Sequence, residues 1–106
     1  MNEVVRGEHA ELMVAVMFVD IRGFTTLSEA LGAQGTFGLI NRYLQVVEPE
    51  IHRTGGHIAQ YLSDGILALF PRDANAAVAA AIGIHRALRL LNDERAQEGQ
   101  APIRIQ

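Results

Sequence analysis

Val14-Ala-Val-Met-Phe-Val-Asp-Ile-Arg-Gly-Phe-Thr-Thr26 is the stretch around which the rest of the chain is organised. Six apolar residues run without interruption into Asp20, after which Gly23 breaks the run and Phe24 opens a helical pattern. A short apolar run that is partly β-branched predicts a central strand over residues 13–19, covered on both faces. A carboxylate at the exit of such a strand, followed by a glycine turn and a helix start, is a place where a cation and a phosphate can meet.

The composition bounds the class of protein. The 106 residues are enough for one domain with one core, and a hydrophobic fraction of 49% is ordinary for a globular chain. A formal net charge of -3 without any basic run argues against binding to nucleic acid. Cysteine is absent, which excludes disulfides and thiolate metal sites and fits a reducing compartment. We expect a soluble cytoplasmic domain without membrane contact of its own, because the longest apolar run is too short to cross a bilayer.

The next part of the chain predicts two helices. Residues 1–12 are mixed and polar, as in a lead-in segment. Apolar residues at spacings of three and four predict a short helix from Phe24 to Leu31, closed by Gly32 and Gly35. A longer helix follows, whose apolar stripe comprises Phe37, Ile40, Leu44, Val47 and Ile51. Pro49 is expected to kink this helix or end its regular part, and Gly55-Gly56 to stop it.

A hairpin and a third helix complete the pattern. Asp64-Gly65 between His57–Leu62 and Ile66–Phe70 predicts a tight turn with positive φ at both central residues. Asp73 is a candidate N-cap for a helix over 74–91 with a wide apolar face, formed by Val78, Ala81, Ile82, His85 and Leu88. Residues 92–100 are expected to form a polar loop. The last residues, 102–106, begin an alternating strand, so we expect a fragment with an incomplete sheet, whose exposed apolar surface favours self-association.

This order of elements predicts an α+β fold, the ferredoxin-like plait (βααββαβ) with strand order 4-1-3-2, truncated at the fourth strand. In that plait the first two strands run parallel with the third between them, so Asp20 and Asp64 emerge at the same edge of the sheet. Two carboxylates without a nearby lysine suit Mg²⁺ or Mn²⁺, and a pair of such cations can serve an in-line phosphoryl displacement. Free N–H groups over residues 23–26 would face the same edge and could hold phosphate oxygens.

Each of these residues also has a plainer interpretation. Asp64 can be a turn residue, Asp20 can cap the turn that follows it, and Gly23 can be an ordinary turn glycine. His57 and His85 occupy a strand position and a helix position without the spacing of a metal site. The functional interpretation depends on the pair of carboxylates and the helix start occurring together.

Several motifs resemble the class III adenylate/guanylate cyclase catalytic domain, in that family's order and over residues 12–106. Its first metal-binding signature is similar to Phe18-Val-Asp-Ile-Arg-Gly-Phe-Thr25. Asn41-Arg-Tyr-Leu44, Gly55-Gly56-His-Ile58 and Leu62-Ser-Asp-Gly-Ile-Leu-Ala-Leu-Phe70 follow. The resemblance identifies the chain as a single, incomplete domain of this family.

The resemblance implies roles for individual residues. Asp20 and Asp64 would be the two metal-binding aspartates, the backbone carbonyl of Ile21 a further metal ligand, and Gly23, Phe24 and Thr25 the phosphate contacts. Two divalent cations, Mg²⁺ or Mn²⁺, would serve the conversion of ATP or GTP to a 3′,5′-cyclic nucleotide and pyrophosphate. The family's sites form between two subunits, which implies a homodimer or another cyclase-domain partner.

Two departures from the family pattern keep alternatives open. Gln60 stands where many adenylate cyclases carry a base-selecting lysine, and Ser63 stands where a glycine usually precedes the second aspartate. An amide both donates and accepts, so Gln60 does not decide between adenine and guanine. The family's transition-state asparagine and arginine lie beyond Gln106, so we expect residues 1–106 to be inactive alone. The alternatives are a non-catalytic cyclase-like regulatory domain and a ferredoxin-like interaction module without a nucleotide site.

Overall fold

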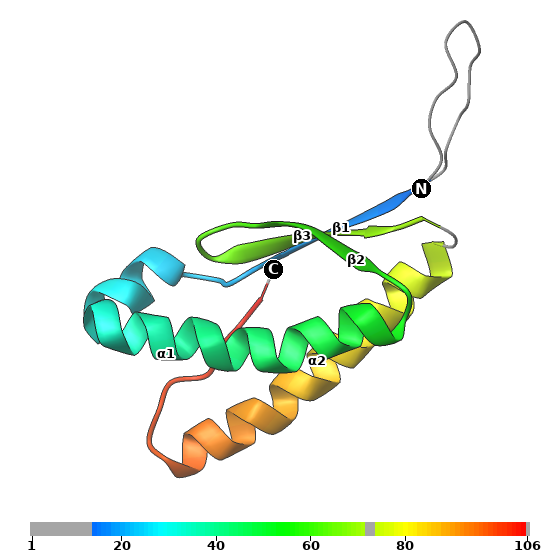
Figure 1. Ribbon diagram of the computed structural model, residues 1–106. Coiled ribbons are helices and arrows are strands. Elements are labelled where there is room, and N and C mark those ends of the chain that lie inside the picture. Colours follow the sequence, from blue (N-terminus) through cyan, green and yellow to red (C-terminus); the bar gives the residue numbers. More distant parts are fainter. Residues whose placement is uncertain (1–13, 72–73, 106) are drawn as a thin grey trace, which may run out of the picture.

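The computed structural model describes residues 14–71 and 74–105 (Figure 1). Strand β1 (Ala15–Asp20) leads into helix α1 (Phe24–Arg53), and strands β2 (His57–Tyr61) and β3 (Gly65–Phe70) precede helix α2 (Ala74–Gln97). The predicted order of elements is confirmed over this part of the chain. The expected lead-in over residues 1–12 and the candidate cap Asp73 lie outside the described residues.

The sheet has the predicted topology. Its strand order is β1-β3-β2, and β3 is antiparallel to both neighbours, so β1 and β2 run parallel with β3 between them. The end of the chain approaches the free edge of β1, where Ile105 forms an isolated bridge with Ile21 and the Arg22 N–H donates to the Arg104 carbonyl at 2.7 Å. This is the position expected for the fourth strand.

The helices cover one face of the sheet, as Figure 1 shows. Val19 is buried and Ala15 and Met17 pack against the core, whereas Val16 and Phe18 on the opposite face are 62% and 55% exposed. The prediction that this strand is covered on both faces is therefore wrong for the described residues. The apolar side chains of the second face instead form an open hydrophobic sheet surface.

Helix α1 contains both predicted helices. Gly32, with φ 74° and ψ -178°, is its only position with non-helical angles, and it separates a short first part from a longer second part. Pro49 does not end the helix, because the buried residues on either side of it, Val47 and Ile51, hold the segment against the core. The expected stripe is partly wrong, since Phe37 is 70% exposed. The buried residues of α1 are Leu39, Tyr43, Val47 and Ile51.

Helix α2 runs further than predicted, through most of the expected polar loop. Leu91 and Arg95 are buried, and the Arg95 Nε donates to the Ala101 carbonyl at 2.8 Å. Asn92 makes two hydrogen bonds with the backbone of Ile103, at 2.9 and 2.8 Å. These contacts fix polar side chains against the returning chain, so the helix continues where composition alone indicates a loop.

The buried face of α2 also differs from the predicted one. Of the predicted residues only Leu88 is buried, and Val78 and Ile82 are 58% and 48% exposed. The residues that α2 buries are Ala80, Gly83, Ile84, Leu88, Leu91 and Arg95. Alanines all round the helix make adjacent stripes nearly equivalent in sequence, so the packing partner chooses between them.

The β2–β3 turn forms, but not with the predicted angles. Neither Asp64 nor Gly65 has positive φ. Glycine is required at residue 65 for another reason, because an added Cβ would lie 2.6 Å from the Val19 carbonyl oxygen. The close approach of β1 to β3 at this point is what brings the end of β1 against the turn.

Candidate active site

Asp20 and Asp64 are brought together at one edge of the sheet. Asp20 is the last residue of β1 and pairs with Gly65, the residue directly after Asp64. The Ile21 N–H donates to the Asp64 carbonyl at 2.9 Å, which ties the exit of β1 to the β2–β3 turn. Both carboxylates are therefore held by backbone hydrogen bonds of the sheet and its turn rather than by a flexible loop.

In the described residues, no basic side chain forms an ion pair with Asp20 or Asp64 to balance their negative charge. Burial raises the pKa of the Asp20 carboxyl above its usual 3.8, and a hydrogen bond with Asp64 and the charge of Asp64 raise it further, against a smaller opposing effect of the Ile21 backbone. Asp20 Oδ1 is buried and has no hydrogen-bond partner among the described residues. Neither carboxylate forms an ion pair within 4.0 Å in the described ranges. An unpaired buried carboxylate oxygen favours a bound cation.

The donor set fits a hard cation. No group of three or more His, Cys, Asp or Glu side chains gathers anywhere in residues 14–71 and 74–105, so the aspartate pair is not part of a larger side-chain cage. The Ile21 side chain is aliphatic and has no ligand atom, so only its backbone carbonyl could serve as a ligand. Two carboxylates completed by a carbonyl, water and phosphate oxygens are the ligands that Mg²⁺ and Mn²⁺ accept.

The start of α1 adjoins the same edge. Gly23 is the N-cap residue in the left-handed conformation, with φ 66°, and it redirects the chain from β1 into the helix. No side chain of the described residues caps this end through a hydrogen bond, and the first turn contains no acidic residue. Phe24 and Thr25 begin the helix, and their N–H groups lie among those that an α-helix leaves without internal partners. Such an end favours a phosphate oxygen.

Gln60 lies on the open face of the sheet. It is exposed in β2 and pairs with Leu67, which in turn pairs with Phe18 of β1. Cross-strand partners share a face, so Gln60, Phe18 and Asp20 all belong to the face that the helices leave open. A bulge between Ile58 and Gln60 interrupts the register of β2. The base-selecting candidate is thus on the same face as the carboxylate of Asp20, two strands away.

Tyr43 lies in the motif Asn41-Arg-Tyr-Leu44, but the sequence assigns it no role in the site. It is 1% exposed, and its hydroxyl has no partner among the described residues. Burial raises the pKa of its phenol, and the charges of Asp20 and Asp64 raise it further. The available signal was a tyrosine inside an otherwise aliphatic helical stripe, but only the fold shows that this stripe faces the carboxylates.

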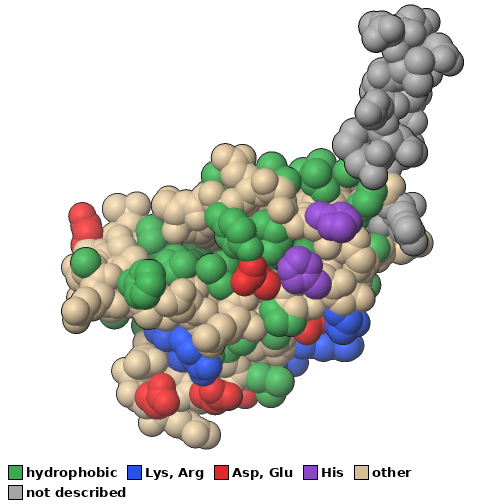
Figure 2. Space-filling model, viewed as in Figure 1, with side chains coloured by type: hydrophobic (Ala, Val, Ile, Leu, Met, Phe, Trp, Pro, Cys, Tyr) green, Lys and Arg blue, Asp and Glu red, His purple; other side chains and the backbone are tan. Residues whose placement is uncertain are grey.

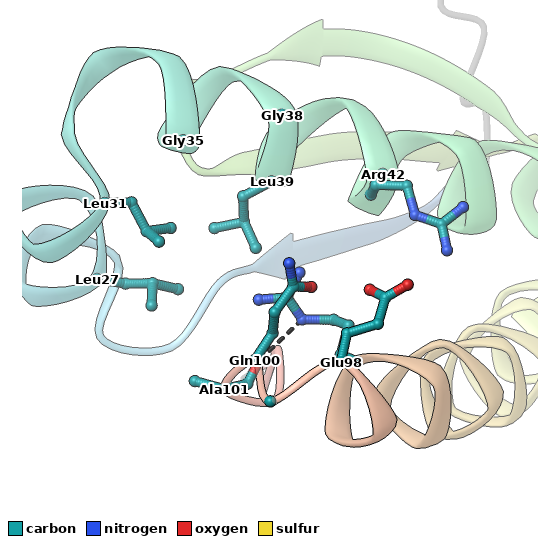
Figure 3. Close-up of a pocket in the computed structure, with 11 residues that line it drawn as sticks. Leu27, Leu31, Gly35, Gly38, Leu39, Arg42, Glu98, Gln100 and Ala101 are labelled. Atoms are coloured by element: carbon teal, nitrogen blue, oxygen red, sulfur yellow. Dashed lines mark hydrogen bonds between the residues drawn. The ribbon is translucent and has the colours of Figure 1, made fainter.

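A cavity of about 560 Å³ lies away from the aspartate pair, between α1 and the residues that follow α2 (Figure 3). Its wall includes Leu27, Leu31 and Leu39. The Arg42 guanidinium at its rim is engaged by Glu94 at 2.9 Å. The two arginines of its lining, Arg42 and Arg95, are thus both engaged by other groups of the protein.

The chain is similar to several known cyclases. The chain is 38% identical over 93 residues to an adenylate cyclase of Anabaena cylindrica, covering 87% of this chain and 18% of that protein. It is 32% identical to each of two solved structures, the guanylyl cyclase Cya2 (TM-score 0.80) and the adenylyl cyclase CyaB from P. aeruginosa (TM-score 0.79). Each structural match covers 87% of this chain, and 50% and 52% of the respective solved chains. No family model matches the sequence.

These similarities confirm the resemblance to the class III adenylyl/guanylyl cyclase catalytic domain and the α+β fold that it implies. The chain belongs with this family and spans about half the length of the solved cyclase chains that it matches. Within the described residues, neither helix has the length and apolarity needed to cross a membrane.

Proposed function

We propose that this chain is the N-terminal portion of a nucleotidyl cyclase catalytic domain that converts ATP, or alternatively GTP, to the 3′,5′-cyclic monophosphate and pyrophosphate. The observation that carries the proposal is the juxtaposition of Asp20 and Asp64 beside an uncapped helix start. The relatives support a cyclase and include both adenylyl and guanylyl enzymes, and Gln60 is compatible with either base.

In this reaction the ribose 3′-oxygen attacks the α-phosphorus, loses its proton, and the bond from the α-phosphorus to pyrophosphate breaks. Two divalent cations would supply Lewis acidity to the attacking and leaving oxygens. The carboxylates of Asp20 and Asp64, with the Ile21 carbonyl, would hold these cations. The backbone at Gly23, Phe24 and Thr25 holds phosphate oxygens and orients them at the positive end of α1.

The proposal includes a second subunit. The open sheet face, which presents Val16, Phe18 and Gln60, would lie in the cleft that a partner domain closes. Figure 2 shows further hydrophobic side chains at the surface over the β2–β3 hairpin and α1, where Tyr61 and Leu62 are exposed. The partner is expected to be a second copy or another cyclase domain.

The test measures cyclic nucleotide formation by the complete domain with Mn²⁺ and either ATP or GTP. Asp20→Ala and Asp64→Ala are expected to lose activity by about 10²-fold or more, the usual effect of removing a group that stabilises developing charge. Asp93→Ala is the matched control, since Asp93 is an exposed aspartate of α2 and does not line the cavity that Asp64 borders. No product from either nucleotide, or full activity in Asp20→Ala, would contradict the proposal.

Ser63 and Gln60 favour a second candidate, a non-catalytic cyclase-like domain that binds nucleotide or a partner in regulation. Both residues depart from the family pattern, and both are exposed next to the aspartate edge. This candidate predicts that the complete domain binds Mn²⁺ and a non-hydrolysable ATP or GTP analogue but forms no cyclic product. Residues 1–106 alone are expected to bind without turnover in either case, because the motifs matched here do not include the family's asparagine and arginine.

A further inference from the structure

Tyr43 carries a buried hydroxyl whose presence needs an explanation. Its side chain lies on the buried side of α1, and its Oη has no hydrogen-bond partner among the described residues. In the same ranges, the other buried side-chain atom in this condition is Asp20 Oδ1. Buried polar atoms in native proteins are nearly always paired, so the unpaired phenol and the unpaired carboxylate oxygen both need an explanation.

Gly65 is a neighbour of both residues. Tyr43, Asp64 and Gly65 line one cavity of about 180 Å³ between α1 and the β2–β3 turn. Asp20 Oδ1 lies 3.4 Å from the position that a Cβ on Gly65 would take. Tyr43 therefore lies in the cavity next to the residue that separates it from Asp20.

The phenol acts towards these carboxylates as a donor. Its hydroxyl makes no other hydrogen bond within the described residues, so its one O–H donor is available to them. An ionised carboxylate has only acceptor sites, which is the complement that a neutral phenol needs.

Packing alone gives no reason for the hydroxyl. The other walls of the cavity include the aliphatic side chains of Ile40, Leu44 and Leu62. A phenylalanine would fill nearly the same volume without burying an unpaired donor, which is unfavourable. The oxygen is therefore better explained by the carboxylates than by the core.

We infer that Tyr43 is a positioning residue of the aspartate pair: its Oη donates a hydrogen bond to a carboxylate oxygen of the pair when Asp20 and Asp64 hold a divalent cation. The inference rests on the proposed function, because it takes the pair to be the cation site. Outer partners of this kind orient the ligating oxygens, and their removal weakens metal binding by about 10–100-fold.

The test compares the chain with its Tyr43→Phe variant in a titration with Mn²⁺, following free Mn²⁺ by electron paramagnetic resonance. Tyr43→Phe is expected to bind Mn²⁺ at least about tenfold more weakly. Tyr61→Phe is the matched control, because Tyr61 is exposed and its hydroxyl donates to Glu48. This variant is expected to bind Mn²⁺ as the unmodified chain does.

Thermal unfolding without metal separates positioning from a structural role. Removing an unpaired buried hydroxyl should leave the Tm of Tyr43→Phe unchanged or higher, whereas loss of a structural hydrogen bond would lower it. A lower Tm, or an unchanged Mn²⁺ affinity in Tyr43→Phe, overturns the inference while leaving the cation site intact. Failure of the unmodified chain to bind Mn²⁺ overturns the cation site itself, and the role of Tyr43 with it.

Discussion

Replacing Gly65 by alanine tests the contact that brings the two aspartates together. The new Cβ would lie 2.6 Å from the Val19 carbonyl oxygen and 3.4 Å from Asp20 Oδ1. Val19 pairs with Ile66 and Asp20 with Gly65, so the oxygen can retreat only by opening the β1–β3 ladder. Overpacking of this kind costs about 1–3 kcal/mol. The loss of backbone freedom in the unfolded chain offsets about 0.4–1 kcal/mol of that cost.

At the midpoints of the two ranges, the net expectation is a loss of about 1.3 kcal/mol in the free energy of unfolding. For a chain of this size that corresponds to a Tm lower by about 5–10 °C. Urea unfolding followed by far-UV circular dichroism, at one fixed protein concentration, measures the change. Gly38→Ala is the control, because no heavy atom lies within 4 Å of its added Cβ and alanine favours a helix by about 1 kcal/mol. A Gly65→Ala variant as stable as the unmodified chain would refute the reasoning.

Three further predictions follow from the same features. Gly32→Ala should destabilise the chain by about 1–3 kcal/mol in the same urea assay, because essentially only glycine adopts φ 74° with ψ -178°. An unchanged stability would mean that the kink at residue 32 relaxes. The pKa of Asp20 is raised above 3.8 in the folded protein, so protonation of Asp20 stabilises the metal-free fold. This stabilisation is complete below pH 3.8 and is lost as the pH rises through the folded-state pKa. Asp20→Asn should reduce the dependence of Tm on pH in thermal melts from pH 3 to 7. An unchanged dependence would mean that other groups cause it. Phe18→Ser should reduce self-association, measured by sedimentation velocity. Leu90→Ser, at a similarly exposed apolar position on α2, should leave it unchanged. Equal effects of the two variants would show that the open sheet face is not the interface.

Local sequence patterns were enough to predict the topology and the meeting of the carboxylates. An uninterrupted apolar run, a helix start after Gly23 and an Asp-Gly turn between apolar segments define the elements and their order. Since short connections and right-handed crossovers leave few arrangements of those elements, the pairing of β3 between β1 and β2 follows. That pairing places the end of β1 beside the β2–β3 turn, and hence Asp20 beside Asp64.

Burial on each face could not be predicted in the same way. The strand before Asp20 is apolar on both faces, and only the assembled sheet shows that Phe18 is exposed while Val19 is buried. Helix α2 passes through a polar segment because Asn92 and Arg95 bond the returning backbone, a long-range contact that leaves no local pattern. Periodicity identifies a helix, but the neighbouring elements choose which of its stripes is buried.

For the site as well, the sequence determines some properties and the tertiary structure determines others. By itself the sequence determined which residue types stand at the ends of the strands and at the start of the helix, since backbone preference and turn chemistry act over a few residues. Only the tertiary structure decided that Asp20 Oδ1 is buried without a partner in the described residues, that Gly65 admits no side chain, and that Tyr43 lines one cavity with Asp64. Asp20, Tyr43 and Gly65 are more than twenty positions apart in the chain, and they exclude water from one another only in the folded protein. Their desolvation therefore depends on the whole fold and not on any one segment.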